Sequence, residues 1–183
     1  MIMNNSPSYL RASLKTDKPV IYVDMDGVLC DFDKRHEELM SKGINQFQAF
    51  NHAFAFKDLD PLPGAIEAWQ SLQEKYDTYI LSTAMWSNTY AWTDKRIWVQ
   101  KYLGKSANKK LILSHNKGLL RGDYLIDDRI ANGVADFEGE HIHFGTEKFP
   151  SWKQVLDYLL TTEEKENEEN QSHNMVQDKE ISK

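Results

Sequence analysis

Two carboxylates follow directly on a short apolar run near the start of the chain. Residues Val20–Val23 are β-branched or aromatic, and Asp24, Asp26 and Gly27 come immediately after them. An apolar run that is closed by acidic residues and glycine is typical of a buried parallel strand. Ligands of open α/β sheets bind beyond the carboxyl ends of such strands. The segment therefore favours an α/β fold with its chemistry at Asp24 and Asp26.

The spacing of these two carboxylates indicates a metal ion. Side chains at positions i and i+2 of an extended chain point the same way, and close carboxylates repel each other unless a cation lies between them. Mg²⁺ prefers a few carboxylate oxygens together with phosphate oxygens. The structural alternative is that acidic residues after a strand cap a helix or occupy a turn. The D-x-D-G motif alone does not decide between these two interpretations.

Predicted strands and helices alternate along the rest of the chain. We expect strands at residues 19–24, 79–81, 111–113, 124–126 and 141–144. We expect helices at residues 33–40, after the Pro-Leu-Pro-Gly break at 61–64, at about 91–103, and from the Ser151–Gln154 capping box onward. This alternation predicts an α/β fold, a Rossmann-like parallel sheet with helices on both faces.

An aromatic-rich insert separates the first strand from the helix that follows residue 64. Phe47, Phe50, Phe54 and Phe56 recur at helical spacing within residues 33–60. Because the insert follows the Asp pair directly, we expect it to be a small helical cap that can cover the end of the first strand. Most of these phenylalanines are expected to fill the core of the cap itself.

The two ends of the chain differ in composition from its centre. Residues 1–17 are polar and aperiodic, which predicts a flexible lead. Residues 163–183 hold seven acids and three lysines, a net charge of −4 within a chain total of −6. Few apolar residues accompany these charges, so we expect a disordered acidic tail. Residues 18–162 are then expected to form a single domain.

The composition also argues against several classes of function. The central domain carries no excess of basic residues, which disfavours binding to a nucleic acid polymer. No run of apolar residues approaches the length that spans a membrane. The single cysteine, Cys30, permits no intrachain disulfide and fits a reducing compartment. We therefore expect a cytoplasmic protein, and we leave open whether it is a monomer or a homodimer.

Reactive side chains follow three of the predicted strands. Asp24 and Asp26 follow the first, and the later positions are Ser82, Thr83, Lys117, Asp127 and Asp128. In a parallel sheet these strand ends share one edge, so one site would hold four carboxylates, two hydroxyls and an ammonium. Clustered like charges destabilise a fold without a ligand. The same side chains are suited to bind a phosphate group together with Mg²⁺, and one of the carboxylates can attack phosphorus.

These segments resemble the four motifs of the haloacid dehalogenase superfamily of phosphatases. The motifs are D-M-D-G-V at residues 24–28, I-L-S-T at 80–83, Lys117, and Y-L-I-D-D at 124–128. The chain is more similar still to the 5′(3′)-deoxyribonucleotidase branch. The segments D-L-D-P-L-P-G-A at 58–65, W-V-Q-K-Y-L-G at 98–104 and L-I-D-D-R at 125–129 carry that likeness, which covers about residues 18–160.

The resemblance implies catalytic and metal-binding roles for the acidic residues. Asp24 would be the nucleophile that forms an aspartyl-phosphate. Asp26 would be the general acid for the leaving oxygen and then the base for the attacking water. Asp24, the backbone carbonyl of Asp26, and Asp128 would hold Mg²⁺. Asp127 would be a neighbouring partner of these ligands.

The resemblance also implies a nucleotide as the small-molecule substrate. Ser82 and Lys117 would hold the phosphate with Thr83 beside them, and Phe32 would stack on the nucleobase. From Asp33 to Asp60 the insert is shorter than in vertebrate members of the branch. The motif that completes their base pocket is not recognisable here. The implied activity is a Mg²⁺-dependent 5′(3′)-deoxyribonucleotidase, with an unassigned preference for base and sugar.

Two other functions are compatible with parts of the pattern. The same fold hosts phosphatases of many other small phosphorylated metabolites. A response-regulator receiver, which accepts a phosphoryl group without turnover, also joins acids, Ser/Thr and Lys at strand ends. Receivers, however, place adjacent acids at the first strand and the lysine on the last. Here the first acids are split by one residue and the adjacent pair comes late, which favours the phosphatase.

Three further residues could be assigned to more than one role. His141 and His143 alternate on a predicted strand and therefore face the same way, either as metal ligands or, more commonly, as histidines at a sheet edge. Trp86 follows Ser82 closely enough to line the mouth of a site, although packing is the ordinary role of a tryptophan.

Overall fold

The protein is described here from a computed structural model that covers residues 18–51 and 55–160. The predicted lead at 1–17, the predicted tail at 163–183 and Phe54 lie outside the described residues. Within the described part, no helix is long and apolar enough to cross a membrane.

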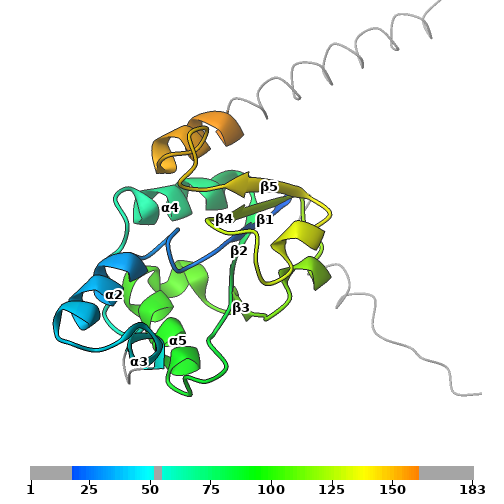
Figure 1. Cartoon of the computed structure of the whole chain (residues 1–183). Helices are drawn as coiled ribbons and strands as arrows, with labels where there is room; N and C mark the ends of the chain where they lie inside the picture. Colours follow the sequence, from blue (N-terminus) through cyan, green and yellow to red (C-terminus); the bar gives the residue numbers. More distant parts are fainter. Residues whose placement is uncertain (1–17, 52–54, 161–183) are drawn as a thin grey trace, which may run out of the picture.

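A parallel sheet forms the centre of the molecule (Figure 1). Its strands are β1 (Val20–Val23), β2 (Asp77–Ser82), β3 (Leu111–Leu113), β4 (Tyr124–Asp127) and β5 (Glu140–His143), in the spatial order β3-β2-β1-β4-β5. Every neighbouring pair is parallel. The order places β1 at the centre between β2 and β4, so the residues that follow these three strands share one edge of the sheet.

Alternation along the strands divides the core into two layers. Ile21 and Val23 of β1 face the larger layer, and Tyr22 faces the smaller one. The larger layer contains the buried faces of α4 (Ala65–Lys75), of α5 (Ala91–Tyr102) and of the helical residues 152–160. The smaller layer is completed by Val134, which begins the short 3₁₀ helix η3 (Val134–Asp136), and by Phe137 directly after it. A second 3₁₀ helix, η2 (Lys117–Leu119), contacts η3.

The chain between β1 and α4 carries two helices, α2 (Phe32–Ser41) and α3 (Gln46–Asn51), which lie side by side next to α5 (Figure 1). Asp31 begins α2, because its carboxylate accepts a hydrogen bond from Lys34 N–H at 3.0 Å. Two hydrogen bonds fix this insert to the sheet domain. Asn88 Nδ2 donates to the carbonyl of Phe50 at 3.0 Å, and Trp98 Nε1 donates to the carbonyl of Leu59 at 2.8 Å.

The predicted α/β fold class is confirmed, and the elements deviate from their predicted bounds by only a few residues. The third strand has the predicted bounds, 111–113. The second is longer than predicted because Asp77 and Thr78 continue its pairing with β1. A further 3₁₀ helix, η1 (Gly104–Ala107), follows α5. At the predicted capping box, Ser151 Oγ donates to Gln154 Oε1 at 2.5 Å, so the two side chains bond each other directly.

Candidate active site

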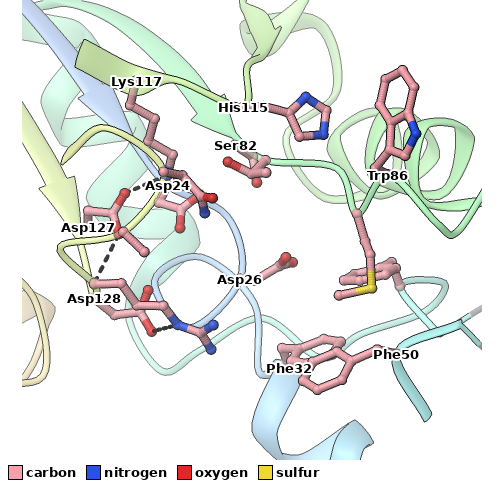
Figure 2. Close-up of a pocket in the computed structure, with 16 residues that line it drawn as sticks. Asp24, Asp26, Phe32, Phe50, Ser82, Trp86, His115, Lys117, Asp127 and Asp128 are labelled. Atoms are coloured by element: carbon pink, nitrogen blue, oxygen red, sulfur yellow. Dashed lines mark hydrogen bonds and ion pairs between the residues drawn. The ribbon is translucent and has the colours of Figure 1, made fainter. Parts of the chain in front are cut away.

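A cavity of about 290 Å³ opens at the carboxyl ends of β1, β2 and β4 (Figure 2). It brings together side chains that are far apart in the sequence. Its lining residues are Asp24, Asp26, Phe32, Phe50, Phe56, Ser82, Thr83, Met85, Trp86, His115, Lys117, Asp127, Asp128, Arg129, Ala131 and Asn132. Every site residue that the sequence predicted is among them. Their assigned roles remain predictions, which the geometry below makes specific.

A tight turn after β1 packs closely against Asp128 in the loop after β4. Gly27 has φ +75°, a left-handed conformation that glycine adopts without strain, and its N–H donates to the carbonyl of Cys30 at 2.9 Å. A Cβ atom on Gly27 would lie 2.6 Å from Asp128 Oδ2. Glycine is therefore required both by the turn and by the close approach of the loop after β4.

Three carboxylates and one ammonium form the floor of the cavity. Oxygens of Asp24, Asp127 and Asp128 all lie within 4.8 Å of one another. Lys117 Nζ lies 2.9 Å from Asp24 Oδ1 and 2.5 Å from Asp127 Oδ2, and this side chain is 3% exposed. Arg129 Nε, on a side chain that is 60% exposed, lies 3.5 Å from Asp128 Oδ2. Three negative groups thus share one buried and one largely exposed positive group, which leaves the floor with excess negative charge.

Burial and the neighbouring charges shift the pKa of the groups in the cluster. Burial, followed by the charge of Asp24, raises the pKa of Asp127 to about 6 and raises the pKa of Asp128 from its ordinary value. Burial opposes the charged form of Lys117, but Asp24 and Asp127 outweigh it, and the Lys117 pKa lies above its ordinary value. A further cation at this position would be stabilised by the same charges.

The donor set of the cluster fits a divalent cation. Asp128 Oδ1 is buried without a hydrogen-bond partner, which is costly for a carboxylate oxygen unless a cation neutralises it. Asp127 is engaged on both oxygens, since Oδ2 contacts Lys117 and Oδ1 accepts from Arg129 N–H at 3.0 Å. Asp24 and Asp128 are therefore the members best placed to bind a hard cation through oxygen.

Asp26 lies apart from the acidic floor, between that group and the ring of Phe32 (Figure 2). Its Oδ2 atom accepts a hydrogen bond from Lys95 Nζ at 2.5 Å, and Cys30 Sγ lies 3.7 Å from its Oδ1 atom. The same ammonium donates to Ser82 Oγ at 3.1 Å. The predicted contribution of Asp26 to a metal site, which would come through its backbone carbonyl, stays a prediction.

Family comparison places this arrangement among known proteins. Residues 42–160 match the family model described as "5′ nucleotidase, deoxy (Pyrimidine), cytosolic type C protein". A protein of Vibrio phage KVP40, provisionally named 5′(3′)-deoxyribonucleotidase, is 51% identical over 149 residues, which are 80% of this chain and 88% of that protein. The chain belongs to the 5′(3′)-deoxyribonucleotidase family. This family consists of phosphoric monoester hydrolases of the haloacid dehalogenase superfamily, as the sequence motifs predicted.

More distant relatives agree with this placement. The human mitochondrial 5′(3′)-deoxyribonucleotidase is 29% identical over 170 residues, covering 74% of this chain and 68% of the human protein. A solved structure of the HAD-type hydrolase YfnB from Bacillus subtilis, bound to magnesium, is similar with a TM-score of 0.50 and 10% identity. This structural match covers 78% of the present chain and 98% of the solved YfnB chain. At this low identity the second comparison supports the fold alone.

Two of the predicted substrate-binding residues of this deoxyribonucleotidase family member are already engaged. Thr83 Oγ1 donates to the carbonyl of Ser114 at 2.8 Å, so its hydroxyl proton does not point into the cavity. The ring of Phe32 is 5% exposed and lies nearly parallel to the rings of Phe50 and Phe56, at 5.5 and 5.0 Å between centroids. Trp86 is 78% exposed and presents far more aromatic surface at the mouth.

His141 and His143 support the acidic loop through its backbone. Their rings stack at 5.0 Å, and their Nε2 atoms lie 3.1 and 3.0 Å from the carbonyl oxygens of Asp127 and Asp128. Neither histidine belongs to the carboxylate cluster that could hold a metal among the described residues. Of the two alternatives left open by the sequence, this geometry favours the structural one.

Lys95, which contacts Asp26 and Ser82 from behind the cavity lining, is a charged residue that the motifs did not predict. A lysine within a charged helical segment ordinarily faces solvent, yet the Lys95 side chain is 0% exposed. The spacing does contain a signal, because Ala91, Trp98 and Val99 lie four residues before, three after and four after it. All three are buried, which places Lys95 on the buried face of α5.

Proposed function

We propose that this chain is a Mg²⁺-dependent phosphomonoesterase that hydrolyses deoxynucleoside monophosphates through an aspartyl-phosphate on Asp24. The position of Asp24 carries the proposal. Its carboxylate lies on the cavity floor at 2.9 Å from the Lys117 ammonium, beside Asp127 and Asp128, and Asp26 follows two residues later. A nucleophile, a phosphate-binding cation and a separate acid thus converge on one cavity.

In the first step a carboxylate oxygen of Asp24 attacks phosphorus. The bond between phosphorus and the ester oxygen breaks, and its electron pair stays on the leaving oxygen. Asp26 transfers a proton to that oxygen, so the nucleoside departs as a neutral alcohol. Lys117 and the Ser82 hydroxyl bind the phosphoryl oxygens and offset their charge.

In the second step water hydrolyses the aspartyl-phosphate. Asp26, now a carboxylate, removes a proton from the water as its oxygen bonds to phosphorus. The bond between phosphorus and the Asp24 oxygen breaks, and its electron pair returns to the carboxylate. Asp26 ends protonated and Asp24 ends free, so the site is restored and inorganic phosphate is released.

Asp24 and Asp128 would hold the Mg²⁺ ion, with the Asp26 carbonyl as the further protein ligand implied by the family resemblance. The bound ion would neutralise phosphate charge and align the phosphoryl group with Asp24. Support for the ion comes from the buried Asp128 Oδ1 atom, which has no hydrogen-bond donor, and from the mutual proximity of the three carboxylates.

The aromatic residues at the mouth support a nucleotide as the substrate. Trp86 lies beside His115, with 5.7 Å between the ring centroids, and both line the cavity. Stacking of a base on an aromatic ring is worth roughly 1–3 kcal/mol and tolerates any base. Strong discrimination between bases needs hydrogen bonds to the base edge. We therefore expect a preference for nucleotides with weak selectivity among bases.

A substrate panel tests this proposal. The full chain would be assayed in Mg²⁺ for phosphate release from 5′- and 3′-deoxynucleoside monophosphates, ribonucleoside monophosphates and sugar phosphates. The Asp24→Asn variant, purified in parallel, measures the contribution of contaminating phosphatases. We expect deoxynucleotides to give the highest kcat/KM. If glucose 6-phosphate or another non-nucleotide exceeds every nucleotide, the chain is a phosphatase of another small metabolite.

A further inference from the structure

The buried ammonium of Lys95 links the two predicted catalytic strand ends to the helical insert. It donates to Asp26 Oδ2 at 2.5 Å and to Ser82 Oγ at 3.1 Å, and it lies 4.9 Å from the centroid of the Phe56 ring. Asp26 follows β1, Ser82 ends β2 and Phe56 belongs to the insert. One side chain from α5 therefore contacts all three parts of the site.

Burial of the Lys95 ammonium is energetically costly unless a well-placed partner compensates for it. An ammonium taken out of water loses favourable solvation, which is recovered only through a well-placed partner. The Lys95 side chain is 0% exposed, whereas that of Asp26 is 21% exposed toward the cavity. The Lys95 ammonium is therefore shielded from water on α5, whereas the Asp26 carboxylate is accessible to a substrate in the cavity.

We propose that Lys95 is a positioning residue that fixes the carboxylate of Asp26 for proton transfer to and from the phosphate ester. A general acid must lie within hydrogen-bond reach of the leaving oxygen, and a displacement of about 1 Å can cost on the order of a hundredfold in rate. Lys95 holds one oxygen of Asp26 and Cys30 Sγ approaches the other, which restricts rotation of the carboxylate. This inference rests on the proposed phosphomonoesterase activity.

The contact with Ser82 fits the same role. Because Ser82 Oγ accepts from the ammonium, its own proton must point away from Lys95. A hydroxyl oriented in this way can donate to a phosphate oxygen. The Ser82 oxygen thus helps to hold the ammonium beside Asp26, and Lys95 acts on the acid without itself contacting the reacting atoms.

The test compares two esters that differ in their need for an acid. The leaving group of p-nitrophenyl phosphate departs as a stable phenolate, whereas the alkoxide of a deoxynucleoside 5′-monophosphate must receive a proton. Because kcat/KM reports the steps up to the first phosphoryl transfer, it isolates the acid step. We expect Lys95→Met to lower kcat/KM for the nucleotide by about tenfold to a hundredfold. For p-nitrophenyl phosphate we expect a change of less than about threefold.

Three further variants define the mechanism of the effect. Lys95→Arg keeps the charge and should recover part of the nucleotide activity. The double variant Lys95→Met/Asp26→Asn should be no slower than Asp26→Asn alone, because Lys95 acts through Asp26. Lys101→Met is the matched control, since Lys101 lies on the same helix, is 48% exposed and pairs with Asp58 on the surface. It should match the wild type on both esters.

Each remaining outcome decides against the inference or against its premise. Equal losses on both esters would assign Lys95 to phosphate binding, and no loss on either would leave it purely structural. If Lys95→Met does not fold, as judged by thermal denaturation, Lys95→Arg decides in its place: a loss confined to the nucleotide supports the inference, and an equal loss on both esters overturns it. If the wild type releases no phosphate from either ester in Mg²⁺, the proposed function itself fails.

Discussion

At the scale of single residues, substitution of Asp24 should abolish catalysis and leave the fold intact. Asparagine preserves the shape of this side chain but removes the attacking oxygen's charge and one predicted metal ligand. We expect Asp24→Asn to reduce kcat to less than about one hundredth of the wild-type value, because loss of a nucleophile costs several decades. The fold should persist, since one negative charge leaves a cluster that holds an excess of them.

Phosphate release and thermal denaturation of the same Asp24→Asn preparation check both parts of this prediction. Asp31→Asn offers a matched control, because Asp31 is also acidic and caps α2 outside the cavity. It should change stability slightly and leave kcat unaltered. Turnover by Asp24→Asn above about a hundredth of the wild-type rate would remove Asp24 from the covalent role.

The acidic floor predicts a pH-dependent response to metal. With the Asp127 pKa at about 6 and its ordinary value at 3.8, the metal-free folded chain binds this proton more tightly than the unfolded chain does. Protonation of Asp127 therefore stabilises the metal-free fold. This stabilisation is fully present below pH 3.8, the ordinary pKa, and is lost as the pH rises through about 6. Mg²⁺ binds the ionised carboxylates, so it should compensate for the loss.

Thermal denaturation with EDTA or Mg²⁺ at about pH 5 and about pH 7.5 measures this effect. We expect the increase in Tm on addition of Mg²⁺ to be larger at the higher pH, where Asp127 and Asp128 are ionised. Asp128→Asn should abolish most of the increase at both pH values. An increase that is equal at the two pH values would separate metal binding from these carboxylates.

The contrast between Asp128 and Lys95 shows how far the sequence predicts individual site residues. Asp24, Asp127 and Asp128 were predictable because each follows an apolar strand, and parallel strands bring their ends to one edge. Lys95 lies in the second turn of a helix, where local composition favours exposure. Helical spacing places Lys95 on the buried face of α5, but its contact with Asp26 depends on tertiary packing, which no local pattern encodes.

At the scale of elements, the loop after β2 and helix α2 present two aromatic residues with different surroundings. Trp86 is 78% exposed, whereas Phe32 is 5% exposed within the aromatic core of the insert. We expect Trp86→Ala to raise KM for a deoxynucleotide by about fivefold to 150-fold, the range given by loss of roughly 1–3 kcal/mol of stacking. Its KM for p-nitrophenyl phosphate should change little, and stability should be nearly unaltered.

Phe32→Ala should behave differently from Trp86→Ala. Truncation of a buried phenylalanine typically costs about 3–5 kcal/mol of folding stability. Loss of the Phe32 ring would also release Phe50 and Phe56, which stack nearly parallel to it and line the same cavity. We expect a lower Tm together with a higher KM for nucleotides. A selective KM effect without a stability effect would show that Phe32 itself stacks on the base.

The sheet was more predictable than the insert for a physical reason. Strands β1, β2 and β4 contain short apolar runs that are buried in the parallel sheet, so their composition marks them, whereas β5 has a single apolar residue, Ile142. The start of α2 is marked by the local Asp31 cap, whereas the end of α3 is held by a separate segment, through Asn88 Nδ2 and the Phe50 carbonyl. Hydrophobic periodicity indicated helices in the insert, but it did not show that the Phe32 ring would be enclosed by Phe50 and Phe56.

At the scale of the whole molecule, the proposed activity depends on a charge balance that the polypeptide does not complete alone. Among the described residues, Lys117 and Lys95 contact Asp24, Asp127 and Asp26, and both ammonium groups are already paired. The Arg129 guanidinium is likewise engaged, with Nε 3.5 Å from Asp128 Oδ2. An incoming phosphate adds more negative charge to a floor with three carboxylates. We therefore expect EDTA to abolish turnover of every phosphate ester and Mg²⁺ to restore it fully.

The identity of the ion that restores activity distinguishes the kind of site. Ca²⁺ prefers more ligands and looser geometry than Mg²⁺, and Asp24 and Asp128 supply only a few protein oxygens. We expect Ca²⁺ to bind, as seen by an increase in Tm, but to support turnover poorly. Asp128→Asn should require a higher Mg²⁺ concentration for half-maximal rate. Full activity in chelator would exclude the metal from the reaction and leave Lys117 as the group that neutralises the phosphate.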